Sequence, residues 1–281
     1  MVGADHGIIC VEISRPPHPS RLMLWNPVTN KKRYSSAKTS KHITYDVCVY
    51  AFGFLEDSMD YRIVHVYKKN FEDTKMSWSL FHPTKKSWSK SMSFNSSVST
   101  IDPHNIVDKG VVYWIGWGGQ QLEDPLIMVI TLDMNSNKFY ETEVPSKAKA
   151  EYNVLTDIQG GVGFLTQTTV DIGTLVQLWR LNSYDEDNMM WEKMITVTGI
   201  SIMYNPAFVI NGDIFSVTEA RTKFAYSGGS QRKNVIISKH EHDKDRPEDL
   251  MSQTWNINVA VKNVTLHCNS LFLGDDPVSK D

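Results

Sequence analysis

The sequence repeats one element at a fixed interval: a glycine followed by a run of apolar, β-branched and aromatic residues. Three copies are "DKGVVYWIG" at Gly110, "IQGGVGFL" at Gly161 and "INGDIFSV" at Gly212, so the spacings are 161 − 110 = 51 and 212 − 161 = 51 residues. Gly7 in "DHGIICVEI" lies 110 − 7 = 103 residues earlier, about two periods. A period near fifty residues built from short strands is typical of a propeller array rather than a sandwich.

Polar turns recur with the same period between the two strands that follow each glycine-led strand. The clearest copy is "LIMVITLDMNSNKFYETEV", whose Asn and Ser residues tolerate turn geometry. The expected turn centres have intervals of 56, 51, 51 and 56 residues and are Thr29, Lys85, Ser136, Asp187 and Asp243.

These two patterns predict an all-β fold, a β-propeller of five or six blades built from a repeat of about fifty residues. Five units are clear, and an incomplete sixth falls near the C-terminus. No linker divides the chain, so residues 1–281 are expected to form one domain with a short polar tail at about 275–281. A hydrophobic content of 41% in 281 residues is enough for a sizeable core.

Stacked blades require glycine-led strands that are apolar on both faces. In "GVVYWI", Val111 and Tyr113 point to one face while Val112 and Trp114 point to the other, so all four are expected to be mostly buried. The glycine is interpreted as allowing a tight entry into the strand nearest the crowded axis. Aromatic residues are expected to pair across the outer hairpins, Trp78 with Trp88 and Trp179 with Trp191.

Net charge and cysteine content limit the partners and the cellular location that we expect for the protein. The net charge is −3 and basic residues cluster only at "KKR" (Lys31–Arg33) and at the adjacent Lys85 and Lys86, so no nucleic-acid partner is expected. No signal peptide or run of ~18 apolar residues is present, so no membrane partner is expected either. Three widely spaced cysteines fit an intracellular protein of the cytoplasm and/or nucleus. They are interpreted as buried small hydrophobes: Cys10, Cys48 and Cys268.

Catalytic and metal motifs are weak. "KHEHDKD", with His240, His242 and Asp243, is interpreted as a solvated loop, because zinc sites usually show a second ligand cluster at a set spacing. The glycines of "GWGGQQ" and "QGGVGF" lead into no helical pattern, and no G-x-S-x-G elbow occurs. We therefore expect no enzyme activity, no cofactor and no metal. A propeller enzyme or a carbohydrate-binding propeller remains the alternative, because fold alone does not choose function.

Several segments together resemble a known family. "GIICVEI", "LMLWNPVTNKKR", "YAFGFLEDSMDYRIVHVY", "KGVVYWIGW" and "VITLDMNSNKFYETEVP" are similar to the F-box-associated, kelch-like propeller domain of plant F-box proteins. The resemblance implies the substrate-recognition part of an SCF ubiquitin ligase, whose F-box docks on a Skp-type adaptor. No F-box pattern precedes Gly7, so this chain is expected to bind target proteins, of unknown identity, and to join the adaptor only if an F-box is supplied.

Recognition is expected on the connections that follow the glycine-led strands, because loops held by a rigid scaffold often carry function. If those strands are second in their blades, these connections share one face and are Ser14–Arg21, Lys68–Met76, Gly116–Pro125, Thr168–Thr174 and Ala220–Lys233. Aromatic and Arg side chains dominate interface hot spots. The predicted partner-binding residues are Phe71, Trp117, Gln120, Arg221, Phe224 and Tyr226.

Overall fold

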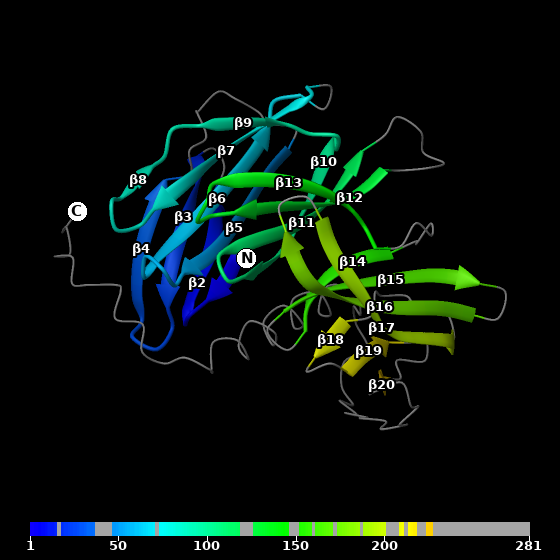
Figure 1. The fold of residues 1–281 in the computed structure, drawn as a ribbon. Coiled ribbons are helices and arrows are strands. Elements are labelled where there is room, and N and C mark those ends of the chain that lie inside the picture. Colours follow the sequence, from blue (N-terminus) through cyan, green and yellow to red (C-terminus); the bar gives the residue numbers. More distant parts are fainter. Residues whose placement is uncertain are drawn as a thin grey trace. The chain divides into compact units, whose positions relative to one another are not determined.

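A computed structural model describes residues 1–15, 18–36, 47–70, 73–118, 126–145, 152–158, 161–170, 173–185, 188–200, 208–210, 213–217 and 223–226. Within these ranges every regular element is a β-strand and no helix occurs, and the strands form five antiparallel sheets (Figure 1). This confirms the all-β class and the repeated sheets. The chain divides into two compact units, Met1–Asn95 with Glu241–Asp281, and Ser96–His240.

Two sheets make up the described part of the first unit. The first is ordered β1(Gly3–Asp5), β2(Ile8–Arg15), β3(His18–Asn26), β4(Lys31–Ser36). The second is ordered β5(Val47–Leu55), β6(Asp60–Lys68), β7(Lys75–His82), β8(Ser87–Trp88). A further strand, β9(Met92–Asn95), pairs with the first half of β7, so two short strands share the outer edge of this sheet.

Three sheets make up the described part of the second unit. They are β10(Thr100–Asp108), β11(Val111–Gly118), β12(Leu126–Asp133), β13(Lys138–Glu143); then β14(Tyr152–Asp157), β15(Val162–Val170), β16(Gly173–Asp185), β17(Asn188–Ile200); then β18(Phe208–Ile210), β19(Asp213–Val217), β20(Lys223–Tyr226). In the sheets of this unit neighbouring strands are consecutive in the chain, as the repeat predicts. The glycine-led strands β2, β11, β15 and β19 are each second in their sheet.

The glycines before β2 and β11 are turn residues, which corrects the interpretation of a tight axial entry. His6 and Gly7 have φ of 43° and 77°, and Lys109 and Gly110 have φ of 49° and 80°. Two consecutive positive φ values are the signature of a type I′ hairpin turn, which joins twisted strands through two residues and favours glycine. The glycine therefore sets the hairpin between the first and second strands of a sheet.

The outer turns owe their shape to an Asn or Asp at the end of the preceding strand. Asn26 Oδ1 accepts hydrogen bonds from the backbone N–H groups of Val28 and Thr29, at 3.0 and 3.1 Å. Asp133 Oδ1 accepts in the same way from Asn135 and Ser136, at 2.8 and 3.3 Å. These Asx-type bonds supply the turn that the polar clusters predict.

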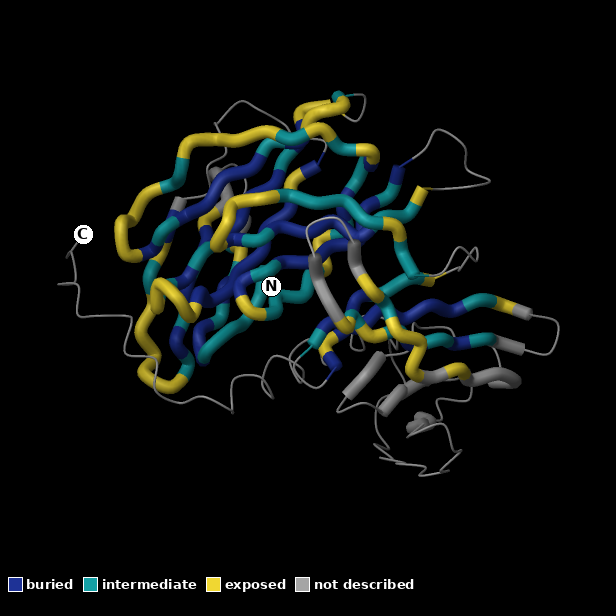
Figure 2. Tube along the Cα trace, viewed as in Figure 1, coloured by how far each residue is buried: buried dark blue, intermediate teal, exposed yellow. Residues whose placement is uncertain are grey.

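Apolar side chains fill the space between the two sheets of the first unit. One core cluster joins residues of both sheets: Ile8, Cys10, Leu22, Leu24, Tyr50, Phe52, Phe54, Tyr61, Ile63 and Phe81. Figure 2 shows the middle strands mostly buried and the turn after β3 exposed. The two sheets of this unit thus each bury one face against the other. A single sheet could not bury its apolar faces without such a neighbour.

In the second unit the predicted burial of the glycine-led strand is largely confirmed. Val112, Tyr113 and Trp114 are buried, while Val111 is partly buried. Tyr113 packs in a cluster with Leu155 and Phe164 of the next sheet. Trp114 points to the opposite face and stacks on Phe139 of β13, with ring centroids 6.3 Å apart. The alternation along β11 therefore serves two different packing layers.

The predicted cross-strand pairs of tryptophans are wrong. Trp88 lies opposite Phe81, whereas Trp78 lies opposite Met92, because the outer edge of that sheet is divided between β8 and β9. In the second unit Trp179 lies opposite Lys193, whose Nζ sits 4.6 Å from the indole centroid, and Trp191 lies opposite Leu181. The register of β16 against β17 therefore places the two tryptophans diagonally across the strand pair, two residues apart.

Candidate protein-binding surface

Short turns gather at one end of the first unit. Asp5 Oδ2, at the end of β1, accepts a hydrogen bond from the backbone N–H of Phe54 at 2.7 Å, and Tyr61 Oη donates to His6 O at 3.2 Å. The β1–β2 and β5–β6 turns are therefore neighbours. Antiparallel pairing then places the β2–β3 and β6–β7 connections together at the opposite end of the unit.

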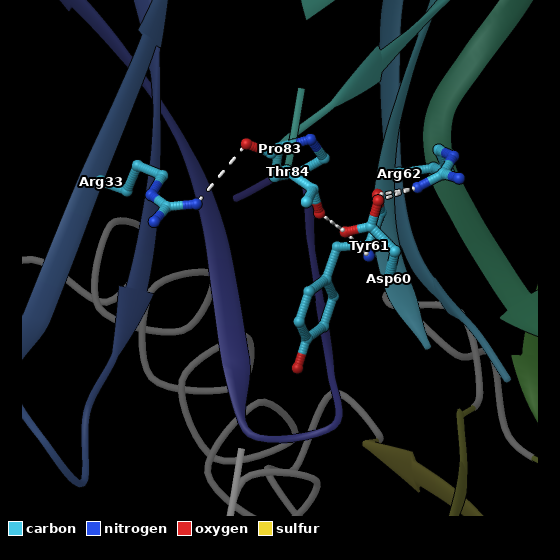
Figure 3. Close-up of polar contacts among 6 residues, drawn as sticks. All are labelled: Arg33, Asp60, Tyr61, Arg62, Pro83 and Thr84. Carbon is cyan, nitrogen blue, oxygen red and sulfur yellow. Dashed lines mark hydrogen bonds and ion pairs between the residues drawn. The ribbon is translucent and has the colours of Figure 1, made fainter. Parts of the chain in front are cut away.

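A polar network around Asp60 fixes this turn end (Figure 3). Asp60 Oδ1 accepts from Tyr61 N at 2.9 Å and from Thr84 Oγ1 at 2.7 Å, and Asp60 Oδ2 pairs with Arg62 Nη1 at 2.5 Å. From the neighbouring sheet, Arg33 Nη1 donates to Pro83 O at 3.5 Å. The network ties the β7–β8 turn to its own sheet and to β4, so these turns are held in place.

All five predicted connections between second and third strands are shorter in the structure, and in two cases only two residues separate the strands. β2 continues to Arg15 and β3 begins at His18, and β15 continues to Val170 before β16 begins at Gly173. The longer connections span 69–74 between β6 and β7, 119–125 between β11 and β12, and 218–222 between β19 and β20. The prediction of a long loop is thus wrong for Ser14–Arg21 and Thr168–Thr174, and Ala220–Lys233 contains strand β20.

The predicted anchors remain predictions. Phe71, Gln120 and Arg221 lie outside the described residues, and Phe224 and Tyr226 fall in β20, whose side chains also lie outside them.

One predicted anchor, Trp117, has a described side chain. Trp117 lies in β11, is partly buried and packs against the core cluster of the second unit. Its indole Nε1 is buried and makes no hydrogen bond to a described residue. Packing is therefore a clear role for Trp117, and its contact with a partner stays a prediction.

A polar hollow of about 370 Å³ lies beside the β6–β7 connection, and no sequence motif predicts it. We call it the β6–β7 hollow, and its lining residues are Tyr67, Lys68, Lys69, Asp73, Thr74, Lys75, Ser77 and Ser93. Ser93 reaches the hollow because β9 pairs with β7, which places Ser93 opposite Ser77. The signal in the sequence is only the three lysines at the ends of the connection, which are Lys68, Lys69 and Lys75.

The β6–β7 hollow is rich in groups that can donate hydrogen bonds. Lys68 is only 3% exposed, although it is charged. The Ser77 and Ser93 hydroxyls lie 3.2 Å apart, and Tyr67 Oη lies 2.5 Å from Ser91 Oγ at its border. The one lining carboxylate, on Asp73, accepts from Asn70 N–H at 3.3 Å.

In the second unit, two glycines of the "GWGG" segment make room for neighbouring residues, Gly118 for the backbone of Ser97 and Gly116 for the side chain of Val98. A Cβ added to Gly118 would lie 2.5 Å from Ser97 O, and one added to Gly116 would lie 2.8 Å from Val98 Cγ2. Ser97 is held there by Glu141 Oε2, which accepts from Ser97 N at 2.9 Å and from Ser97 Oγ at 2.6 Å. These glycines therefore serve close packing at the end of β11.

A second hollow of about 190 Å³ lies along β10 and β14 in the same unit. The pairing of β10 with β11 is irregular between Ile101 and Asn105, which displaces the intervening residues. His104 Nε2 lies 3.0 Å from Leu155 O, and His104 N donates to Asp102 Oδ1 at 2.8 Å. Since His104 bonds to the next sheet, this hollow is a packing contact between the two sheets.

Ionisable groups with shifted pKa values are few. Burial raises the pKa of the Cys10 thiol, as expected for a buried small hydrophobe. The prediction of burial is wrong for Cys48, which is exposed, with its Sγ 3.4 Å from His65 Nε2. Partial desolvation still raises the pKa of Cys48. Partial burial, together with the charges of Arg62 and Lys85, lowers the pKa of His82. Cys268 lies outside the described residues.

Within the part of the chain that the structure describes, no three His, Cys, Asp or Glu side chains gather as a metal site would require. His240, His242 and Asp243 lie outside that part. No helix among the described residues could span a membrane.

Comparisons with known proteins agree with this architecture. A family model described as the F-box associated beta propeller domain matches residues 7–272. A search of curated proteins finds no match.

Solved structures of low sequence identity also align with the chain. Puromycin hydrolase aligns with a TM-score of 0.52 at 11% identity, over 85% of this chain and 39% of that chain. The β-propeller domain of the Trilobed protease from Pyrococcus furiosus aligns with a TM-score of 0.47 at 10% identity, over 83% and 69% of the two chains. TolB from Acinetobacter baumannii gives 0.42 at 12% identity, over 82% and 53%. These likenesses concern the fold alone.

Proposed function

The chain belongs to the F-box associated beta propeller domain family, and we propose that it is the substrate-recognition module of an SCF-type ubiquitin ligase. In this role the propeller binds a target protein, and an F-box supplies the contact with a Skp-type adaptor. The proposal includes no catalytic step on the propeller itself and places the protein in the cytoplasm or nucleus.

The contrast between the two ends of the sheets supports this proposal most strongly. At one end of the first unit, two-residue and Asx-type turns and the Asp60 network hold the chain firmly. At the other end of the first unit lie the 69–74 connection and the β6–β7 hollow. In the second unit, the 119–125 connection follows β11 at the end of the strand opposite the Lys109–Gly110 turn. Variable connections on a rigid scaffold are the usual site of recognition.

Affinity purification with two forms of the protein tests the proposal. One form is residues 1–281, and the other carries an F-box fused upstream of Met1. Partners shared by both forms are expected to be targets, and partners found only with the fusion are expected to include the Skp-type adaptor.

Each outcome bears on a separate part of the proposal. Stoichiometric binding of purified Skp-type adaptor by residues 1–281 alone would contradict the division of roles. Retention of glycans on an array, with no protein partner enriched by either form, would favour a carbohydrate-binding propeller instead.

A further inference from the structure

We propose that the β6–β7 hollow binds a phosphorylated Ser or Thr side chain of the target protein. This inference rests on the proposed function and deepens it, because it gives the chemical class of the segment that the propeller reads. It follows from the charges, the hydrogen-bond donors and the shape of the hollow.

The charge of the hollow favours an anion. Three of its eight lining residues are lysines and one is an aspartate. Among the described residues, no carboxylate forms an ion pair with Lys69 or Lys75, both of which are exposed. Lys68 adds a third positive charge from a nearly buried position, where electrostatic interactions are less screened by solvent.

The single lining carboxylate is engaged by its own connection. Asp73 Oδ2 accepts from the backbone N–H of Asn70 at 3.3 Å, and Asp73 N donates to Asn70 O at 3.1 Å. These two bonds join Asn70 to Asp73 and hold the carboxylate against the Asn70 backbone. Asp73 therefore shapes the wall of the hollow.

The neutral groups of the hollow are mostly hydroxyls. Thr74, Ser77 and Ser93 can each donate to an anionic oxygen, and Ser77 and Ser93 already lie within 3.2 Å of each other. A phosphate group presents three acceptor oxygens and about −1.5 to −2 charge, whereas a carboxylate presents two oxygens and −1. Several ammonium groups beside several hydroxyls match the phosphate better.

The occupant is a protein segment rather than a nucleic acid or a membrane. Nucleic-acid binding usually needs a broad basic face that contacts many phosphates, while this chain has a net charge of −3 and concentrates these lysines in one concave site. The hollow has room for a single phosphorylated side chain with its neighbours, because its volume is about 370 Å³.

Peptide arrays test this assignment with a matched control. Three degenerate libraries would differ only at the central residue, which is phosphoserine, serine or glutamate, and would be probed with residues 1–281. The test variant is K69Q/K75Q, and the control variant K32Q/K85Q removes two exposed lysines from the turn end of the same unit. Inorganic phosphate serves as the competitor.

We expect the phosphoserine library to bind at least about tenfold more tightly than the other two, in a salt-sensitive manner. K69Q/K75Q should lose about tenfold in affinity, since exposed charge pairs contribute modestly each, and K32Q/K85Q should lose less than about twofold. Equal binding of the three libraries, or equal losses in the two variants, would overturn the proposal. Tighter binding of anionic vesicles or single-stranded oligonucleotides through the same lysines would also overturn it.

The two proposals can fail separately. If K69Q/K75Q still captures the partners shared by both purified forms, the phosphate site is wrong and the recognition role stands. If no protein partner is captured by any form, the recognition role itself is wrong.

Discussion

Replacing Asp60 by alanine should destabilise the first unit by about 3.5 kcal/mol. The substitution removes two hydrogen bonds to neutral donors, Tyr61 N and Thr84 Oγ1, each contributing about 1 kcal/mol. It also removes the pair with Arg62, whose side chain is only 12% exposed, beside an Asp60 side chain that is 18% exposed. A hydrogen bond to a charged group contributes about 1.5 to 3 kcal/mol. We take the lower value, because Arg62 Nη1 keeps its bond to Tyr61 O at 2.8 Å.

Urea denaturation followed by tryptophan fluorescence measures this loss as a change in the free energy of unfolding. D60N should cost less than D60A, because the amide oxygen can still accept from Thr84. D57A is the control, since Asp57 is exposed in the same β5–β6 turn and its removal should change stability by less than about 0.5 kcal/mol. A loss below about 1 kcal/mol for D60A would refute the view that this network fixes the turn end.

Three further predictions concern packing, thiol reactivity and pH. G118A should lower the free energy of unfolding in urea by about 1 to 3 kcal/mol, because its Cβ would meet a backbone carbonyl at 2.5 Å. G161A is the control: its Cβ has its nearest contact at 3.6 Å, so stability should change by less than about 0.5 kcal/mol. Similar losses in the two variants would contradict the steric account. Alkylation followed by peptide mapping should modify exposed Cys48 in the native protein and buried Cys10 only on unfolding, and the reverse order would be inconsistent with their burial. The pKa of His82 is lowered from 6.5 in the folded state, so the unfolded state binds more protons and stability falls as pH decreases through 6.5. H82Q should therefore weaken the pH dependence of the free energy of unfolding between about pH 7.5 and 5.5. An unchanged pH dependence in H82Q would refute this role of His82.

The strand order and outer turns could be predicted from sequence because each repeat carries its own local signals. Asn26 and Asp133 direct their turns by side-chain bonds to nearby backbone, and such bonds depend on a few adjacent residues. The 51-residue interval then repeats the same local solution. The role of Gly110 was predicted incorrectly because its importance lies in a positive φ shared with Lys109, which a spacing pattern does not reveal.

The candidate site was harder to predict because it depends on pairing between distant segments. Ser93 lines the β6–β7 hollow only because β9 takes part of the edge of β7, and the same division gives Trp88 a different partner from the predicted one. The connection at Ser14–Arg21 is shorter than predicted because the flanking strands extend to Arg15 and begin again at His18. Composition reveals which segments can turn, but strand pairing decides how long they are.

Hydrogen–deuterium exchange of residues 1–281, with and without a target protein captured by both purified forms, tests the central claim most directly. Binding is predicted to slow exchange in peptides that cover the 69–74 and 119–125 connections. Peptides that cover Pro27–Asn30 and Pro83–Lys86 should exchange at the same rate in both states. Protection confined to those two turns, with none at the longer connections, would contradict the claim that this propeller recognises its target through the connections between the second and third strands.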